Sequence, residues 1–242
     1  MASGVGIEPT RLTAGLATVP QIEPLGNYPL PDPFHTSGSL YTSAGTNLGI
    51  VTVANDFLYA SDLTNVTSNF ASGTLSTTVG GGVAVYTPTA ATAATIYKAG
   101  QFMQFVAGQK LWFMTRVALS ALTGTARYGL QAGSAFTADS LMFVTTVTTG
   151  VISFVSIIGS ATTVLIANVG TITAGTFIEL AYYYDGNDIL VYVGGALVGR
   201  VSAPTIGTNI TSVLLTPAIQ STPSATETTS VDFVFAAAEI AR

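Results

Sequence analysis

From about residue 41 onward the chain is a succession of short apolar stretches broken by glycine or Asp-Gly, with almost no helical periodicity. Such a pattern predicts strands separated by turns, and many short strands at regular spacing are typical of a β-sandwich or barrel. The Thr- and Ala-rich segment Thr87–Thr95 is predicted to be an exposed loop. The expected strands are Val83–Tyr86, Leu111–Leu119, Arg127–Gln131, Leu141–Val147, Val151–Ile157, Thr163–Ala167, Thr176–Tyr184, Ile189–Val193, Ala196–Val201, Val213–Gln220 and Val231–Phe235.

Leu111–Leu119 is the clearest of these strands. Side chains alternate between the two faces of a strand, so the odd-numbered residues from Leu111 share one face and Trp112, Met114 and Arg116 share the other. Trp112 and Met114, together with Tyr128, would form either an exposed contact patch or part of the packed interior. We expect packing in the interior.

Asp185–Asp188 lies between two apolar stretches and predicts a hairpin, because glycine at position 186 supplies the positive φ of a tight turn. A second turn at Gly194–Gly195 leads into Ala196–Val201, which gives a three-strand meander. The Asp and Asn side chains of the first turn either bond their own backbone or bind calcium. We expect the turn and no metal site.

The first forty residues differ from the rest and are assigned to an extended arm, residues 1–40, ahead of a sandwich domain, residues 41–242. Six of the ten prolines lie between residues 9 and 34, which excludes a helix and favours an extended chain. The arm either packs on its own domain or docks on a partner, and we expect the second. The residues predicted to bind the capsid or another partner are Leu12, Ile22, Leu25, Tyr28, Leu30 and Phe34.

Only 8% of the residues are charged, and the net charge is −5. Binding to nucleic acid or to an anionic membrane surface needs a basic patch, so neither is expected. No apolar run is long enough for a transmembrane helix. With so few charges to keep monomers apart, the chain is suited to an assembly, and a neutral soluble domain is the alternative that the composition supports equally.

Candidate catalytic groups are scarce. His35 is the single histidine, cysteine is absent, and Glu179 and Asp232 are the carboxylates that fall within the expected strands. A hydrolytic triad, a cysteine nucleophile and a multi-histidine zinc site therefore have no support. The paired carboxylates of a glycosidase are not spaced along any strand. We expect no enzyme activity, no catalytic residue and no cofactor.

Tyr183–Gly186 followed by Val191–Gly195 resembles the laminin-G-type form of the concanavalin A-like jelly roll, in which a strand ending in Tyr-Tyr-Asp-Gly precedes one reading Leu-Tyr-Val-Asn-Gly. This resemblance implies an all-β, concanavalin A-like jelly-roll sandwich, here with an extended N-terminal arm.

A second pattern covers nearly the whole chain. It comprises Arg11–Gly15, Leu25–Pro33, Phe105–Arg116 with its Phe-x-Ala-Gly-x-Lys-Leu core, Gly129–Gln131 and Val231–Val234. The pattern resembles a family of virion proteins from short-tailed phages. The resemblance implies a protein on the outer surface of the capsid, bound to the major capsid protein as a homo-oligomer.

The sequence therefore predicts a non-enzymatic virion structural protein that decorates or cements the phage capsid. The alternative is a lectin-like module that binds carbohydrate on the same fold, either free or displayed on the virion. A fibre or tail component remains a third interpretation.

Overall fold

A computed structural model describes residues 48–55, 66–70, 73–79, 83–88, 90, 93–98, 103–133, 136, 139–202 and 213–241. The predicted arm, with its six partner-binding residues and His35, lies outside the described residues.

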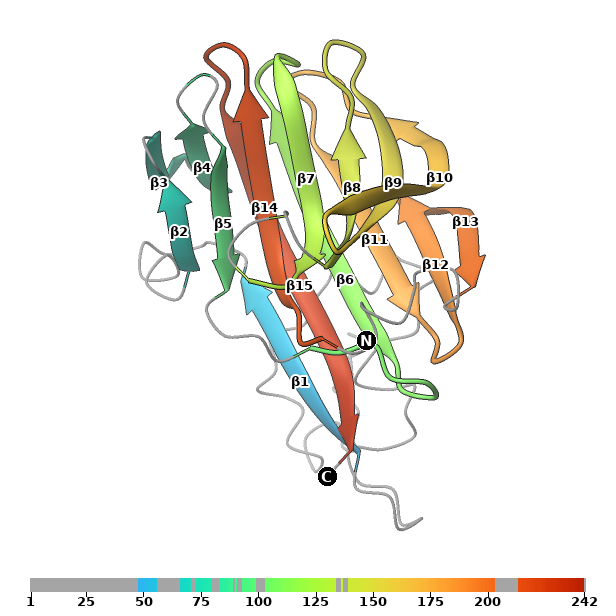
Figure 1. Ribbon diagram of the computed structural model, residues 1–242. Coiled ribbons are helices and arrows are strands. Elements are labelled where there is room, and N and C mark those ends of the chain that lie inside the picture. Colours follow the sequence, from blue (N-terminus) through green and yellow to red (C-terminus); the bar gives the residue numbers. More distant parts are fainter. Residues whose placement is uncertain are drawn as a thin grey trace, which may run out of the picture.

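The described strands form two antiparallel sheets that lie face to face (Figure 1). Sheet A has the order β13-β12-β11-β6-β15-β4-β3, with β1 also paired to β15, and sheet B has the order β10-β9-β8-β7-β14-β5-β2. Sheet A comprises β1 (Leu48–Asn55), β3 (Gly73–Val79), β4 (Val83–Pro88), β6 (Leu111–Leu119), β11 (Ile178–Tyr184), β12 (Asp188–Val193), β13 (Ala196–Ser202) and β15 (Thr229–Ala241). Sheet B comprises β2 (Val66–Phe70), β5 (Ala94–Lys98), β7 (Gly124–Gln131), β8 (Ser140–Thr145), β9 (Val151–Ile158), β10 (Ala161–Thr171) and β14 (Thr216–Pro223).

Strand β15 organises sheet A because it is 13 residues long and is paired along both edges. One edge pairs with β6, while the other pairs with β4 near the start of β15 and with β1 near its end. A bulge between Val231 and Phe233 interrupts the β6 pairing and gives Asp232 no opposite residue. Sheet A therefore has β11, β6 and β15 side by side at its centre.

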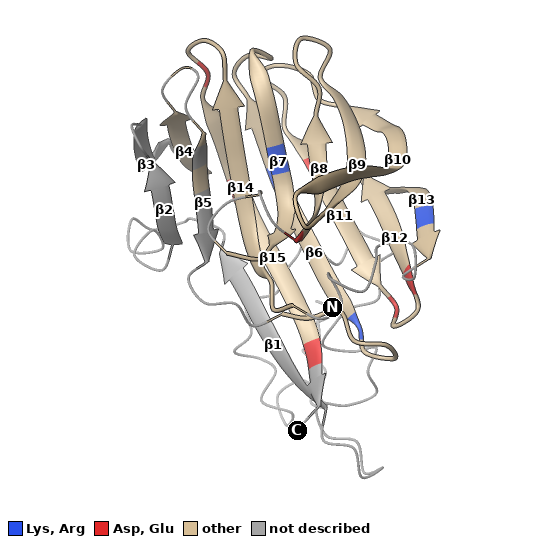
Figure 2. Ribbon diagram, in the orientation of Figure 1, with Lys and Arg blue, Asp and Glu red and all other residues tan. Residues whose placement is uncertain are grey.

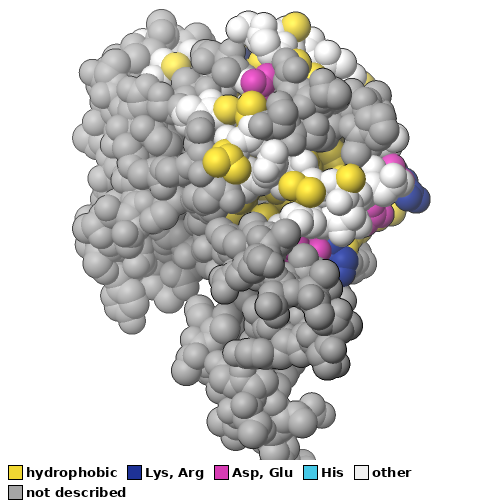
Figure 3. Space-filling model, turned by 60° about the horizontal axis from the view of Figure 1, so that its bottom comes forward, with side chains coloured by type: hydrophobic (Ala, Val, Ile, Leu, Met, Phe, Trp, Pro, Cys, Tyr) yellow, Lys and Arg dark blue, Asp and Glu magenta, His cyan; other side chains and the backbone are white. Residues whose placement is uncertain are grey.

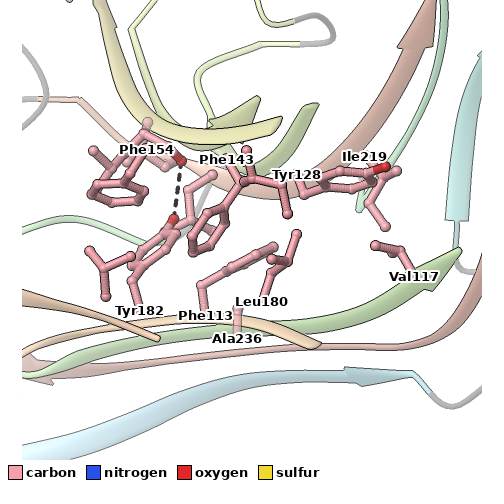
Figure 4. Close-up of a cluster of buried hydrophobic side chains, with 14 of the residues drawn as sticks. Phe113, Val117, Tyr128, Phe143, Phe154, Leu180, Tyr182, Ile219 and Ala236 are labelled. Atoms are coloured by element: carbon pink, nitrogen blue, oxygen red, sulfur yellow. Dashed lines mark hydrogen bonds between the residues drawn. The ribbon is translucent and has the colours of Figure 1, made fainter. Parts of the chain in front are cut away.

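Aromatic side chains fill the space between the sheets (Figure 4). The rings of Phe113 and Tyr182, both on sheet A, stack with centroids 5.1 Å apart and planes inclined by 22°. Phe154 of sheet B lies 5.3 Å from the same Tyr182 ring. The Tyr182 hydroxyl donates to the Leu141 carbonyl oxygen at 3.2 Å, so a hydrogen bond joins the two sheets through the core. This satisfied hydroxyl lets a tyrosine occupy an interior position.

The predicted all-β sandwich is confirmed, and every stretch expected to be a strand overlaps an observed strand. The prediction that Thr87–Thr95 is an exposed loop was wrong at both ends, because β4 continues to Pro88 and β5 begins at Ala94. Thr95 is buried at 1% exposure, whereas Ala90 and Ala93 are exposed. The strands β1, β2, β3 and β5 were not predicted individually. Threonine, serine and alanine dilute the apolar pattern of β2, β3 and β5, whereas β1, with the sequence Leu-Gly-Ile-Val-Thr-Val-Ala-Asn, has a strand-like composition that was overlooked.

Charged side chains are sparse over the described strands (Figure 2). On the face shown in Figure 3, hydrophobic atoms interleave with uncharged polar atoms, and charged atoms gather in a few places. Large exposed hydrophobic side chains among the described residues lie on separate elements, with Val164 on β10 at 56% and Leu197 on β13 at 55%. Hydroxyls, amides and backbone therefore make up most of the polar surface that faces water.

We expect the fold to be lost cooperatively in alkali. Burial raises the pKa of Tyr86, Tyr128 and Tyr182 well above the ordinary value of about 10. The unfolded chain therefore loses phenolic protons at a pH where the folded chain still retains them. The free energy of unfolding stays constant below about pH 10 and decreases as the pH rises toward the folded pKa values. Absorbance at 295 nm and circular dichroism should change together, whereas full ionisation near pH 10 with intact dichroism would contradict the burial.

Candidate functional site

The outer face of sheet A, turned away from sheet B, carries a regular array of side chains. On the three central strands, Glu179, Arg116 and Phe233 are opposite one another in one row. The next row contains Ala181, Met114 and Phe235, and the row after that Tyr183, Trp112 and Ala237. Strand β12 extends these two rows with Tyr192 and Leu190. The face therefore has a charged row beside a largely aromatic area.

Arg116 is the centre of the charged row. Its Nη1 donates to Asp232 Oδ2 at 2.5 Å, and its Nε lies 4.0 Å from Glu179 Oε1. Its guanidinium carbon lies 4.8 Å from the centre of the Phe177 ring, within the range of a cation–π contact. The bulge before Phe233 brings Asp232 to this guanidinium. The side chains of Arg116, Glu179 and Asp232 are 41%, 34% and 24% exposed, so water reaches all three.

The aromatic area, here called the outer-face cluster, is separate from the interior core. Trp112 lies 5.3 Å from Tyr183, with the ring planes inclined by 36°. Burial, followed by the negative charges of Asp185 and Glu239, raises the pKa of Tyr183 to about 12. The cluster is nearly inaccessible to water, since Trp112 is 1% exposed and Met114 is 0% exposed. Its members are Trp112, Met114, Ala181, Tyr183, Tyr192, Phe233, Phe235 and Ala237.

Lys110 and Glu239 border the far end of the cluster, one residue before β6 and near the end of β15. The Lys110 backbone N–H donates to Glu239 Oε2 at 2.8 Å, and Lys110 Nζ lies 3.8 Å from Glu239 Oε1. The Glu239 backbone N–H donates in turn to the Lys110 carbonyl oxygen at 2.9 Å. Glu239 was missed as a strand carboxylate because β15 was predicted to end at Phe235.

The predicted hairpin turn is confirmed by its backbone bonds. Asp185 Oδ1 accepts from the N–H of Asn187 at 2.9 Å and from the N–H of Asp188 at 2.7 Å. Asp188 Oδ2 accepts from Arg200 Nε at 2.7 Å. These carboxylates therefore serve the turn and the neighbouring strand. Among the described residues, His, Cys, Asp and Glu do not come together in any group of three or more that could hold a metal ion.

The expectation that Trp112, Met114 and Tyr128 are packed away from water is confirmed, but they occupy two different places. Tyr128 belongs to the interior core, while Trp112 and Met114 belong to the outer-face cluster. Glu179 and Asp232, singled out separately in the sequence, meet at Arg116. Their meeting depends on strand order, which no local sequence signal provides.

Residues of the second sequence pattern, in Phe105–Arg116 and Gly129–Gln131, have structural roles here. Phe105 packs edge-on against Tyr184 with centroids 5.3 Å apart. The Gly108 N–H donates to the Gly186 carbonyl oxygen at 2.8 Å. At Gly129, an added Cβ would lie 2.2 Å from the Leu141 carbonyl oxygen, so the close approach of β7 to β8 requires glycine. These residues therefore stabilise the sandwich itself.

Within the described segments, no helix is long and apolar enough to cross a membrane.

Neither a protein-family model nor a curated protein sequence matches this chain. Solved structures with the same fold do match. A β-1,3-1,4-glucanase (lichenase) from a mouse hindgut metagenome is 14% identical, with a TM-score of 0.57 over 76% of this chain and 97% of its own. An endo-1,3-β-glucanase from Streptomyces sioyaensis is 14% identical, with a TM-score of 0.58 over 83% of this chain and 99% of its own. The metal-free carbohydrate recognition domain of Emp46p is 10% identical, with a TM-score of 0.51 over 75% of this chain and 93% of its own. At these identities the likeness shows the fold alone: this chain is a concanavalin A-like β-sandwich.

Proposed function

We propose that this chain is a non-catalytic carbohydrate-binding protein that uses the outer face of sheet A. The observation that carries the proposal is the partly exposed row of Arg116, Glu179 and Asp232 beside the half-buried ring of Phe177. Sites for small polar ligands combine apolar and aromatic surface with a few placed polar groups. A guanidinium and two carboxylates offer both donors and acceptors to sugar hydroxyls. The fold shared with the glucanases and the carbohydrate recognition domain supports the same assignment.

Stability gives little reason for this charged row. Exposed ion pairs contribute about 0–1 kcal/mol to folding. Arg116 and Glu179 are both more than a third exposed, so their pairing is screened by water. A chain in which only 8% of residues are charged nevertheless places three of them together. Ligand recognition accounts for this arrangement better than folding does.

The geometry of the row favours binding over hydrolysis. A glycosidase needs two carboxyl groups on either side of the scissile bond. Here Glu179 on β11 and Asp232 on β15 do lie on either side of β6, but the guanidinium of Arg116 occupies the space between them. A sugar would meet an occupied position rather than an open one. We therefore propose that the chain binds glycan without cleaving it.

Calorimetric titration of the full chain with soluble β-1,3-glucan and β-1,3-1,4-glucan, extended by a glycan array, tests this proposal. We expect saturable binding and no release of reducing sugar. Arg116→Ala should weaken binding at least about tenfold, the effect of losing a central contact. Arg127→Ala is the matched control, because Arg127 lies on sheet B, away from the proposed site. There its Nη1 donates to Gln220 Oε1 of the neighbouring strand at 2.5 Å. Absence of binding to every glycan, or equal loss in both variants, would contradict the proposal.

A virion structural protein that binds the major capsid protein is the second candidate. The sparse charge of the described strands favours it (Figure 2), since weakly charged surfaces suit permanent contacts. Adding purified chain to capsids that lack it should give a fixed number of copies per particle, measured by quantitative mass analysis. Capsid binding that survives excess glycan would indicate a separate capsid surface. Failure to bind any capsid would remove this candidate.

A further inference from the structure

The outer-face cluster is buried, yet all its members lie on the strands of one sheet. Trp112 is 1% exposed, Phe235 1% and Ala237 0%. Side chains stand roughly perpendicular to a sheet, so neighbours within the sheet shield their flanks and leave their tips open. Sheet B packs against the other face. Burial this complete therefore requires a further layer over the cluster, and none of the described strands supplies it.

The N-terminal 47 residues enter the described structure next to this cluster. Leu48, the first residue of β1, pairs with Ala241 of β15. Ala241 is four residues beyond Ala237, the cluster residue opposite Trp112, and this corresponds to about 13 Å along the strand. The thirteen residues between Phe34 and Leu48 can span about 45 Å when extended. Residues 9–34 can therefore reach every part of the cluster.

The composition of residues 9–34 suits a layer on a sheet face. Six prolines favour an extended chain over a helix in this segment, and each of them lacks the N–H that an apolar surface would leave unpaired. Its apolar side chains, among them Tyr28, Leu30 and Phe34, need burial that an extended strip cannot provide for itself. In polyproline II geometry 26 residues measure about 80 Å, while the four strands of the cluster are about 14 Å across.

We propose that residues 9–34 dock as an extended strip on the outer-face cluster of their own molecule. The arm would then pack on its own domain. The sequence analysis considered this interpretation but favoured docking on a partner. It makes the cluster an intramolecular docking surface for a proline-rich apolar segment. The proposal does not depend on carbohydrate binding by the charged row.

Trp112 is the single tryptophan of the chain, so its fluorescence reports the cover directly. The full chain should emit at short wavelength and resist quenching by acrylamide. Replacing Tyr28, Leu30 and Phe34 by serine should shift the emission to the red and increase the quenching constant severalfold. Matched variants carry Leu58→Ser with Leu63→Ser, or Ile206→Ser with Ile210→Ser. These matched variants should leave the emission unchanged. The proposal would be overturned if one of them shifted the Trp112 emission to the red while the arm variant did not.

Cross-linking of the full chain keeps the proposal testable if the serine variant fails to fold. The chain has no cysteine, so two can be placed freely. Leu30→Cys with Leu197→Cys, an exposed position opposite Tyr192, should form a bis-maleimide link within one monomer. Leu30→Cys with Val147→Cys, exposed in the turn between β8 and β9, should not. Links between two chains would show that a second copy supplies the cover, and equal linking at both positions would show that the arm has no fixed place; either result overturns the proposal.

Discussion

Gly186→Val is expected to lower the free energy of unfolding by about 3–5 kcal/mol, enough to unfold much of the protein at moderate temperature. Gly186 has φ of +99°, a region that β-branched residues avoid. An added Cβ would lie 2.8 Å from the Gly108 Cα and 2.9 Å from its carbonyl carbon. Both neighbours are backbone atoms, so the two loops would have to separate. Their separation would also break the hydrogen bond from the Gly108 N–H to the Gly186 carbonyl oxygen.

Urea unfolding followed by circular dichroism measures this loss as a lower midpoint at unchanged slope. Gly194→Ala is the control, because Gly194 also has a positive φ, +57°, but nothing lies within 4 Å of an added Cβ. That variant should lose about 1 kcal/mol from backbone strain alone. Equal midpoints for the two variants would show that the contact with Gly108 contributes nothing.

Local sequence pattern predicted most of the sandwich because the side-chain period of a strand is visible in one stretch of chain. Leu111–Leu119 was placed to the residue, with its two faces correctly assigned. The same reasoning failed for β3, whose Gly-Thr-Leu-Ser-Thr-Thr-Val sequence has a weak apolar alternation. Tertiary pairing with β4, rather than local pattern, accounts for that strand.

The candidate site was only partly accessible from the sequence. Its carboxylates Glu179 and Asp232 could be recognised, but their common partner Arg116 lies 63 residues before the first and 116 before the second. The order β11-β6-β15 brings them together, and strand order follows from the packing of the whole domain. Trp112 and Tyr128 are both buried, but in different clusters. Which cluster each joins depends on the sheet and the face that it occupies, and the local sequence does not indicate these.

Glu227 had no signal in the sequence, yet its substitution is expected to be among the most damaging in the chain. It lies just before β15 and is 0% exposed. Its Oε2 accepts from the Thr123 N–H at 2.9 Å and from Thr123 Oγ1 at 3.0 Å, and its Oε1 accepts from Ser221 Oγ at 3.2 Å. The carboxylate thereby fastens the loop between β14 and β15 to the turn between β6 and β7.

Glu227→Ala should lower the free energy of unfolding by about 3–5 kcal/mol. It leaves a cavity, and the buried donors of Thr123 and Ser221 lose their charged acceptor. Glu227→Gln should lose roughly 1–2 kcal/mol, because a carbonyl oxygen can still accept from Thr123 while Ser221 Oγ accepts from the new amide. Thermal and urea unfolding of both variants beside the unchanged chain would separate the two effects. If the glutamine variant were as unstable as the alanine variant, the negative charge rather than the hydrogen-bond geometry would hold this end of the sandwich closed. If neither variant lost stability, the loop would be held by its backbone bonds instead, from the Ser224 N–H to the Thr123 carbonyl oxygen and from the Ser120 N–H to the Thr228 carbonyl oxygen.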